Sequence, residues 1–260
     1  MNEHVEIALE ASKRAGEEIL KHYRQVVLTE KKQDGSPVTI ADKRSHQALS
    51  QILSGTALPI VSEEGDELFP QANEYWLVDP LDGTKDFIAQ NGEFTVNIAQ
   101  MRNGLPVLGV VSALALGETY LGIASIGSWR INQSGQEPLS KTGRDEQTRI
   151  ATSRFHDHPA VESFARLNQI KNKIMIGSAL KYCYLASDRA EVFPRLVGSS
   201  EWDTAAGQVI LESVGGKVLY WSSCKRLEYG KAKRRNGALL GFRSPYGVVD
   251  FSNAPLENLE

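Results

Sequence analysis

The stretch from Phe94 to Asn132 limits the fold of this chain most strongly, because it divides into strand-length apolar segments separated by short glycine-containing breaks. The breaks are Asn103-Gly104, Gly117-Glu118 and Gly127-Ser128. Such dipeptides are typical of tight turns between antiparallel strands. The sequence therefore predicts an antiparallel meander in the middle of the chain.

Two helices and two short strands are predicted before the meander. Residues 3–23 carry apolar side chains at helical spacing, and a second apolar period runs from Ala41 to Ile52 after a polar stretch from Glu30 to Pro37. The runs from Leu58 to Ser62 and from Tyr75 to Val78 are short, apolar and partly β-branched or aromatic, which predicts buried strands. Both strands lead directly into acidic residues.

Strands and helices alternate in the remainder of the chain, which indicates a mixed α+β and α/β fold. Strands are predicted over Arg149 to Ser153, Lys173 to Ile176 and Lys217 to Trp221, and helices over Pro159 to Leu167, Ser178 to Ser187 and Asp203 to Val214. Without an internal repeat or a long linker, residues 1–260 are expected to form one unit with two approximate subdomains. Residues 1–135 would form the α+β part with the metal site and residues 136–260 the α/β part on the substrate side, with the site in a cleft between them.

The overall charge and the cysteine content exclude several classes of protein. Lysine and arginine number 29 against 32 aspartates and glutamates, so the net charge of −3 provides no general attraction for nucleic acid. Cys183 and Cys224 lack metal-ligand spacing and are interpreted as reduced thiols. The best membrane-span candidate, Val107 to Gly117, is too short, and the N-terminus lacks the apolar stretch of a secretory signal. We therefore expect a cytoplasmic protein without integral membrane contact. Peripheral contact with the inner membrane and the oligomeric state stay open.

Carboxylates gather at the ends of the two predicted strands. The first strand leads into Glu63 and Glu64, and the second into Asp79 and Asp82. The proline and glycine of Asp-Pro-Leu-Asp-Gly favour a turn that would aim both aspartates at one point, with the Leu81 carbonyl as a third oxygen. Oxygen ligands of this kind suit Mg²⁺. A plain surface turn explains the pentapeptide equally well, but four clustered carboxylates repel one another unless a cation neutralises them.

Two further segments allow a structural and a functional interpretation. Asp203 precedes a predicted helix and would be an ordinary N-cap, although the small residues 205–207 would let this helix approach another backbone closely. Thr39 and Asp42 stand near the start of the second helix, where they would again serve as caps. If Asp42 instead faces the acidic cluster, it could accept a hydrogen bond from Thr84, whose oxygen could then take a proton from water.

These segments together resemble a known family. The ordered set is SPVTIAD, VSEEGD, WLVDPLDGTKDF, NGEFTVNIA and EWDTAAGQVILESVGG. It resembles the lithium-sensitive, Mg²⁺-dependent phosphomonoesterases of the inositol monophosphatase superfamily over nearly the whole chain. The resemblance implies the layered αβαβα sandwich of these sugar phosphatases. Within the superfamily, DPLDGTKDF followed by NGEFTVNIA, together with GSALKYCYLASDRAEVFPRL, is similar to the CysQ branch of 3′(2′),5′-bisphosphate nucleotidases. Its members hydrolyse 3′-phosphoadenosine 5′-phosphate to AMP and phosphate and clear a by-product of sulfate assimilation.

The resemblance also implies residue roles. One Mg²⁺ would be held by Glu63, Asp79 and the Leu81 carbonyl, and a second by Asp79, Asp82 and Asp203, with a third metal left open. Catalysis would involve Asp42, Thr84 and Glu63, with the first two activating a metal-bound water, and the backbone amides of Gly83 and Thr84 would bind phosphate. An amide-rich helix start suits an anion. Water is then the nucleophile of an in-line displacement between two cations. The five histidines lie outside every acidic motif, so no Ser/His/Asp triad competes with this interpretation.

The substrate side carries a weaker signal. Ser178 and Lys181 lie in the segment that handles the nucleotide in the family, Asp203 would also contact the substrate, and Arg195 is expected in a loop. Simple surface polarity would explain these residues nearly as well. The basic segment 225–235 could help to bind a substrate with two phosphates, although most such segments are only solvated. Near its end, Asn236-Gly237 stands where the branch usually has Asn-Pro.

Three alternatives remain beside the bisphosphate nucleotidase. The first is an inositol or sugar phosphatase of the same superfamily, with the same metals and another pocket. The second is a non-catalytic module for divalent cations, in which Thr84 and Asp42 would have no function. The third is an RNA-binding protein that uses residues 225–235, which the negative net charge and the single intervening aromatic residue, Tyr229, disfavour.

Overall fold

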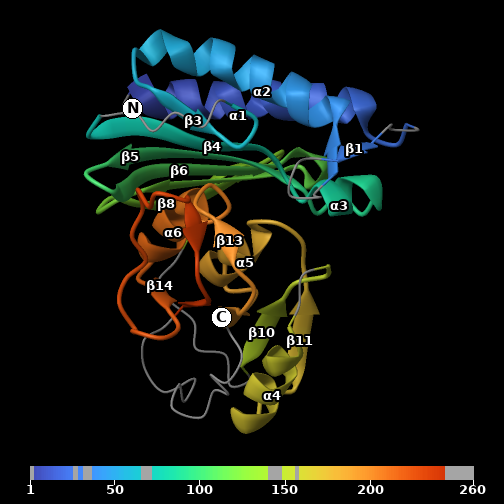
Figure 1. Ribbon diagram of the computed structural model, residues 1–260, viewed down its shortest axis with the longest axis vertical. Coiled ribbons are helices and arrows are strands. Elements are labelled where there is room, and N and C mark those ends of the chain that lie inside the picture. The colour runs from blue at the N-terminus through green and yellow to red at the C-terminus, as the bar shows by residue number, and fades with distance from the viewer. Residues whose placement is uncertain are drawn as a thin grey trace.

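The computed structural model describes residues 3–25, 29–31, 37–65, 72–139, 148–155 and 158–243. Its elements form five layers, helix–sheet–helix–sheet–helix, which agrees with the αβαβα sandwich expected from the resemblance (Figure 1). The outer helices on one side are α1 (Glu3–His22) and α2 (Ile40–Leu53), the middle helices are α5 (Leu180–Ala186) and α6 (Ala205–Glu212), and α4 (Pro159–Leu167) covers the far side.

The larger sheet has seven strands in chain order. They are β3 (Ile60–Ser62), β4 (Glu74–Asp82), β5 (Thr95–Arg102), β6 (Leu105–Ala113), β7 (Glu118–Ile123), β8 (Gly127–Asn132) and β9 (Gly135–Pro138). Only β3 and β4 pair in parallel, and every later neighbour is antiparallel. The predicted meander is therefore confirmed, and β9 extends it by one strand.

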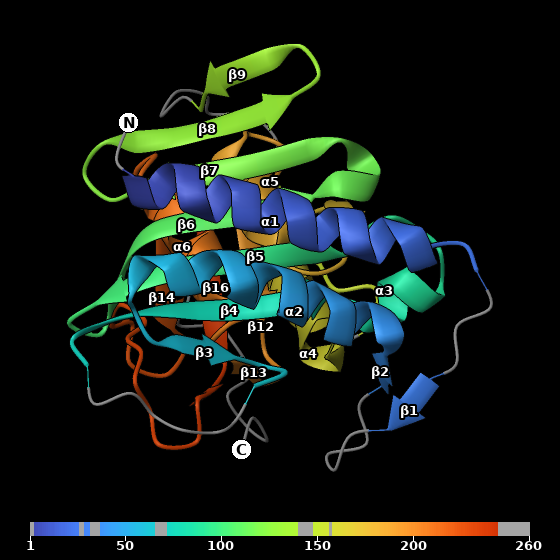
Figure 2. The same ribbon diagram turned by 90° about the horizontal axis from the view of Figure 1, so that it is seen from above.

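The two faces of this sheet are covered by different helices. Helices α1 and α2 lie side by side across one face (Figure 2), where the small and aliphatic stripe of α1 packs against Trp76 and Leu121. Helix α6 lies on the other face at unusually short range. A side chain at Gly109 would stand 2.5 Å from the backbone oxygen of Ala206, and one at Gly122 would stand 2.6 Å from the Cα atom of Ile210. Glycine at these two strand positions therefore lets α6 lie directly on the sheet.

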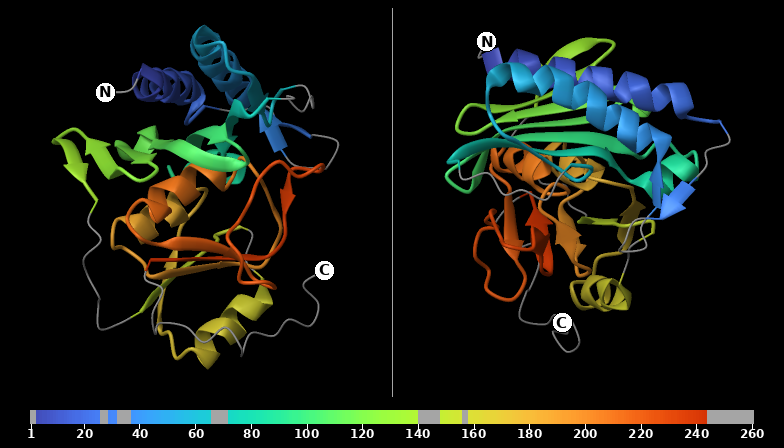
Figure 3. Two further views of the ribbon diagram at one scale, coloured as in Figure 1. Left: turned by 90° about the vertical axis from the view of Figure 1, so that its left-hand side faces the viewer. Right: turned by 45° about the horizontal axis from the view of Figure 1, so that its top comes forward.

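The second sheet has five strands in the order β11-β10-β12-β16-β14. The strands are β10 (Arg149–Thr152), β11 (Asn172–Met175), β12 (Val192–Arg195), β14 (Lys217–Tyr220) and β16 (Leu239–Phe242). Helix α4 packs on its outer face, where the rings of Phe164 and Trp221 meet edge to face. The two sheets lie one above the other with α5 and α6 between them (Figure 3).

The predicted helices and strands in the described ranges are present, with small differences at their ends. The sequence did not predict β12 and β16, and the loop expected at Arg195 is wrong because Arg195 ends β12. Strand β12 is only four residues long and contains Pro194, which strands tolerate where the hydrogen-bond ladder is incomplete. Here β12 pairs with β10 at a single position, Val192 with Ile150, and with β16 over its full length.

Five further short elements belong to the described fold. They are β1 (Thr29–Lys31) paired with β2 (Pro37–Thr39), helix α3 (Thr84–Ile88), and β13 (Ser199–Ser200) paired with β15 (Arg235–Asn236). No helix among the described residues is long and apolar enough to cross a membrane. The subdomain boundary near residue 135 stays a prediction.

Candidate functional site

A cavity of about 470 Å³ lies between the large sheet and the second half of the chain. The end of β4, the start of α3, the segment after β10, the start of α5 and the segment between β12 and α6 line it. Nearly all of the predicted site residues face this space, namely Glu63, Asp79, Leu81, Asp82, Gly83, Thr84, Ser178, Lys181, Arg195 and Asp203. Segments that lie far apart in the sequence therefore meet in one place.

The two aspartates of Asp-Pro-Leu-Asp-Gly lie on an irregular strand end. The sequence predicted that the strand ends before Asp79, but β4 continues to Asp82, with a shift in its pairing with β5 between these two residues. The Leu81 amide donates to Oδ1 of Asp79 at 3.0 Å and fixes the bend. The sequence predicted a free turn here, but an irregular strand end takes its place. This irregularity directs the carboxylates of Asp79 and Asp82 to the same cavity.

The Asp82 carboxylate joins three parts of the chain. Its Oδ2 atom accepts hydrogen bonds from the Asn97 side chain on β5 at 3.1 Å and from the Ala179 amide before α5 at 2.6 Å. The Thr95 hydroxyl lies 3.4 Å from the same oxygen. These contacts hold Asp82 in one orientation at the junction of the two halves.

The capping interpretation of Asp203 is wrong. Thr204 occupies the N-cap position of α6 and makes no side-chain capping bond. Asp203 instead lies in the cavity lining, where its Oδ2 accepts the Ser200 amide at 2.9 Å. The close packing of α6 expected from its small residues is present, since a side chain at Gly207 would stand 2.5 Å from the Tyr182 ring.

Asp42 makes the contact that each interpretation requires, because its two carboxylate oxygens bond to different groups. Oδ2 accepts the Thr39 amide at 2.7 Å and completes a capping box at the start of α2. Oδ1 lies 3.3 Å from the Thr84 hydroxyl, which donates to it. Gly83, just before Thr84, has φ of 88°, a left-handed conformation that favours glycine, and so α3 can begin immediately beside the carboxylates.

The carboxylates at the acidic end of the cavity have raised pKa values because they are buried close to one another. Burial, followed by the charges of Glu63, Asp82 and Asp203, raises the pKa of Asp79 well above its usual range. Burial and the charges of Asp82 and Glu63 raise the pKa of Asp203 to about 7. A raised carboxyl pKa means that the site resists holding this much negative charge without a cation.

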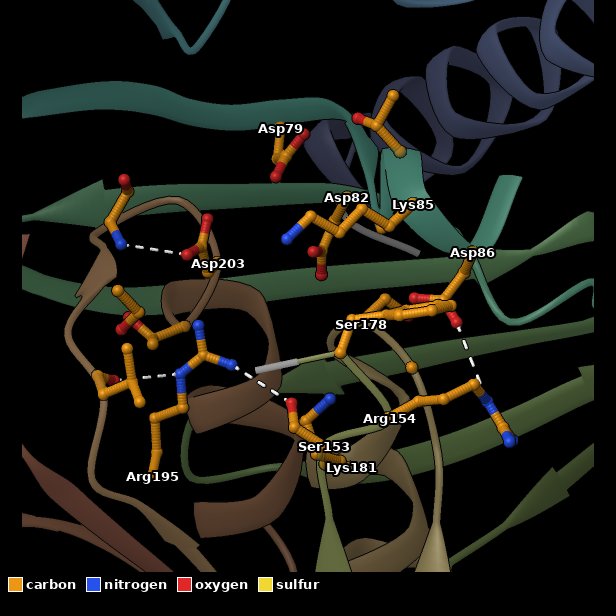
Figure 4. A pocket seen from close by; sticks show the side chains of 18 of the residues that line it. Asp79, Asp82, Lys85, Asp86, Ser153, Arg154, Ser178, Lys181, Arg195 and Asp203 are labelled. Atoms are coloured by element: carbon orange, nitrogen blue, oxygen red, sulfur yellow. Dashed lines mark hydrogen bonds and ion pairs between the residues drawn. The ribbon is translucent and has the colours of Figure 1, made fainter. Parts of the chain in front are cut away.

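The donor chemistry of this end fits a hard divalent cation, since it consists of carboxylates and one backbone carbonyl. Figure 4 shows Asp79, Asp82 and Asp203 facing a common space, with the Lys85 side chain reaching toward Asp82. Among the described residues, no three His, Cys, Asp or Glu side chains already stand at the spacing of a finished metal centre. The charges of Glu63, Asp82 and Asp203 oppose the ionised form of Asp79, and a bound cation would offset them.

Polar and cationic groups line the opposite end of the cavity. The Ser178 hydroxyl is buried and has no hydrogen-bond partner within the described part of the chain. The Lys181 ammonium is buried, donates to the Ile176 carbonyl at 3.0 Å and lies 5.4 Å from the centre of the Phe193 ring. Burial, then the nearby charge of Arg195, lowers the pKa of Lys181 to about 8. A hydroxyl that has no partner among the described residues and shares a cavity lining with two cations suits an anionic ligand.

The cations of the basic segment 225–235 make different contacts, and most of them do not face the cavity. Arg226 forms an ion pair with Glu212, and Lys231 lies 2.9 Å from Glu201, away from the cavity lining. Arg235 alone of the segment's described cations lines the cavity, and it donates to the Ser200 hydroxyl at 3.1 Å. Asn236 follows it and donates to the Ser200 carbonyl at 3.0 Å, which closes this wall through β13 and β15.

The edge of the cavity carries an ion pair that was not predicted from the sequence. Arg154 contacts Glu93 at 2.8 Å, and Glu93 also accepts the Gly177 amide at 2.9 Å. Glu93 stands in NGEFTVNIA, where a single acid at the start of an apolar strand was the available signal. None of the histidines in the described ranges lines the cavity, and His156 lies outside those ranges.

Comparisons of the sequence and of the structure with known proteins identify the same group of relatives. The inositol monophosphatase family model matches residues 1–239. The chain is 33% identical over 235 residues to the 3′(2′),5′-bisphosphate nucleotidase CysQ of Buchnera aphidicola, and the match covers 88% of each chain. It is 36% identical over 232 residues to the protein of the same name from Salmonella typhimurium, covering 86% of this chain and 93% of that one. The crystal structure of CysQ from Bacteroides thetaiotaomicron is similar with a TM-score of 0.82 and 32% identity, over 92% of this chain and 97% of that chain.

Proposed function

The chain belongs to the inositol monophosphatase family, and we propose that it is a Mg²⁺-dependent 3′(2′),5′-bisphosphate nucleotidase that converts 3′-phosphoadenosine 5′-phosphate to AMP and phosphate. The observation that carries this proposal is that carboxylates and cations line the same cavity. The lining combines the carboxylates of Glu63, Asp79, Asp82 and Asp203 with the Ser178 hydroxyl and the cations of Lys181 and Arg195, and Figure 4 shows Asp79 and Asp82 on the side away from Lys181 and Arg195. A substrate with two phosphates can place one at the metal-binding carboxylates and the other against the cations. The names of the curated relatives support the same substrate.

Mg²⁺ ions would be held by the Asp79, Asp82, Asp203 and Glu63 carboxylates and the Leu81 carbonyl. When bound, the ions would lower the pKa of the attacking water and neutralise the charge of the phosphate oxygens. Their identity and number are part of the proposal. The strained charge balance of the acidic end supports a requirement for cations.

The Thr84 hydroxyl would receive the proton of the attacking water. Because Thr84 donates its own hydrogen to Oδ1 of Asp42, its oxygen lone pairs are free to accept one from the cavity side. Oδ1 of Asp42 can then take up the proton, while Oδ2 remains bonded to the Thr39 amide. The capping box holds the base in place during this transfer.

The second phosphate would contact the Ser178 hydroxyl and the cations of Lys181 and Arg195. The Arg195 guanidinium is oriented by two hydrogen bonds, to the Ser153 hydroxyl at 3.4 Å and the Val197 carbonyl at 3.1 Å. Its orientation before binding reduces the entropy lost on contact with phosphate. The amides of Gly83 and Thr84, at the carboxylate end of the lining, would bind the phosphate that is removed.

The alternative is an inositol or sugar phosphatase of the same family, which would use the same carboxylates without a second phosphate. The test is phosphate release from 3′-phosphoadenosine 5′-phosphate and from inositol 1-phosphate, each with Mg²⁺, with chelator and with added Li⁺. Preference for the nucleotide that is lost on chelation supports the proposal, and preference for inositol 1-phosphate contradicts it. The cytoplasmic location stays a prediction.

A further inference from the structure

The cavity lining contains two exposed apolar side chains that can bind neither a phosphate group nor a metal ion. Phe155 is 43% exposed and Val197 is 37% exposed, although both line the same cavity. The other large apolar residues of the lining, Leu81, Tyr182 and Phe193, are buried. Phe155 and Val197 therefore offer open apolar surface to whatever enters a cavity that is otherwise largely polar and charged.

The hydrogen bonds of Arg195 connect the two chain segments that carry Phe155 and Val197. Its guanidinium bonds to Ser153, two positions before Phe155, and to the carbonyl of Val197 itself. Figure 4 shows Arg195 directed toward Ser153, at the side of the cavity away from Asp79 and Asp82. The apolar surface thus adjoins the cation that would bind the second phosphate.

Arg154, the residue directly before Phe155, is anchored as well. The Arg154 side chain bonds to both carboxylate oxygens of Glu93 and to the Met175 carbonyl. The chain is therefore held through the side chains of Ser153 and Arg154, the two residues before Phe155, whose own side chain is 43% exposed. A rigid aromatic ring loses little conformational entropy when it forms a contact.

We infer that Phe155, together with Val197 in the same cavity lining, forms the stacking surface for the nucleobase of the substrate. The inference rests on the proposed bisphosphate nucleotidase function and adds the residue that would distinguish a nucleotide from a sugar phosphate. A nucleobase has a flat apolar face that stacks on aromatic side chains, whereas a sugar phosphate offers no such face. With one phosphate at the carboxylates and the second at Arg195, the base has this apolar wall within reach of the same cation.

The test compares two ligands that differ only in the base, AMP and ribose 5-phosphate, by titration calorimetry in Mg²⁺ buffer. The variants are Phe155→Ala, Phe155→Trp and, as a matched control, Leu167→Ala. Leu167 is 47% exposed on α4 and does not line the cavity. Stacking predicts that the wild-type protein prefers AMP and that Phe155→Ala binds AMP roughly tenfold more weakly, with the affinity for ribose 5-phosphate unchanged. Phe155→Trp and Leu167→Ala should bind both ligands as the wild type does.

Two results would overturn the inference. One is a wild-type protein with equal affinity for both ligands, and the other is a Phe155→Ala variant that keeps the wild-type ratio or loses affinity for both ligands equally. Turnover of 3′-phosphoadenosine 5′-phosphate by the wild type is measured separately. If that turnover is absent, the proposed function fails, while a Phe155-dependent preference for AMP would still support a base-stacking site.

Discussion

The Asp82 carboxylate accepts a hydrogen bond of 2.6 Å from the backbone amide of Ala179, a residue 97 positions later in the chain. Ser178 precedes Ala179 and has a buried hydroxyl without a hydrogen-bond partner among the described residues, and Lys181 follows two positions after Ala179. The acidic end and the cationic end of the cavity are therefore joined through one hydrogen bond. A movement of Asp82 would move the segment proposed to bind the second phosphate.

Because of this contact, two substitutions can distinguish the effect of the Asp82 charge from the effect of its hydrogen bond to Ala179. Asp82→Asn keeps an oxygen that can accept the Ala179 amide but loses the negative charge, whereas Asp82→Ala loses both. We expect both variants to lose at least about a hundredfold in turnover because the cation loses a ligand. Only Asp82→Ala should also unfold more easily, by about 1–2 kcal/mol for an unpaired amide. Steady-state kinetics and denaturant titration measure the two effects, and appreciable turnover by Asp82→Asn would contradict the proposed metal ligand.

Removal of Mg²⁺ should destabilise the fold itself. A cation that binds only the folded protein at 100 times its Kd adds about 2.7 kcal/mol to the free energy of unfolding. The repulsion that raises the pKa of Asp79 should therefore be relieved by Mg²⁺ and restored by chelator. The measurement is the melting temperature with Mg²⁺ and with chelator, for the wild type and for Asp79→Asn. The variant should show little Mg²⁺ dependence, and an equal shift in both proteins would argue against Asp79 as a ligand.

Substitution of Thr84 should affect the chemical step more than binding. Thr84→Ala removes the hydroxyl that bonds to Asp42, and general-base catalysis contributes about 10² to 10⁴ in rate. We expect kcat to fall by about that factor with a much smaller change in KM. Thr84→Ser keeps the hydroxyl and should retain most of the turnover. Unchanged kinetics in Thr84→Ala would remove the pair from the mechanism.

The pKa of Lys181, about 8, predicts a pH dependence of nucleotide binding. The charged groups around its ammonium are Arg195, which lowers this pKa, and Asp82, Asp86 and Glu93, which raise it. Below pH 8 the side chain is a cation and binds the second phosphate, and above pH 8 it becomes neutral. KM for 3′-phosphoadenosine 5′-phosphate should therefore rise as the pH increases through about 8. In Lys181→Arg, whose side chain stays charged, this rise should be absent, and a KM independent of pH in the wild type would contradict the assignment.

The parts of the fold that could be predicted are those with local signals. The meander has turn dipeptides, and the helices at residues 3–22 and 40–53 have helical periods within their own sequence. Strand β12 has only four residues, contains Pro194 and is defined by pairing with Leu239–Phe242, far along the chain. Such a strand has no local period to detect.

Some residues of the candidate site also have local signals in the sequence, and others do not. Strand ends rich in acids indicated Asp79 and Asp82 directly, because the residue types and the spacing are local. Asp203 could not be distinguished from a helix cap by sequence, since both tasks use the same side chain at the same position. The pair of Arg154 and Glu93 depends on contact across 61 positions, which no local pattern reveals.

The close packing of α6 on the large sheet should be required for activity as well as for stability. A methyl group at Gly122 would lie 2.6 Å from the Cα atom of Ile210, so the Gly122→Ala variant must push α6 away from the sheet. Overpacking of this kind destabilises proteins by about 1–3 kcal/mol. Because Asp203 stands just before α6, the displacement should also lower turnover in the protein that remains folded. Gly55→Ala is the matched control, since a side chain at Gly55 would meet no atom within 4 Å. Calorimetric melting and turnover at a temperature well below the transition measure both effects. If Gly122→Ala melts earlier but keeps wild-type turnover, the position of Asp203 does not depend on this helix contact.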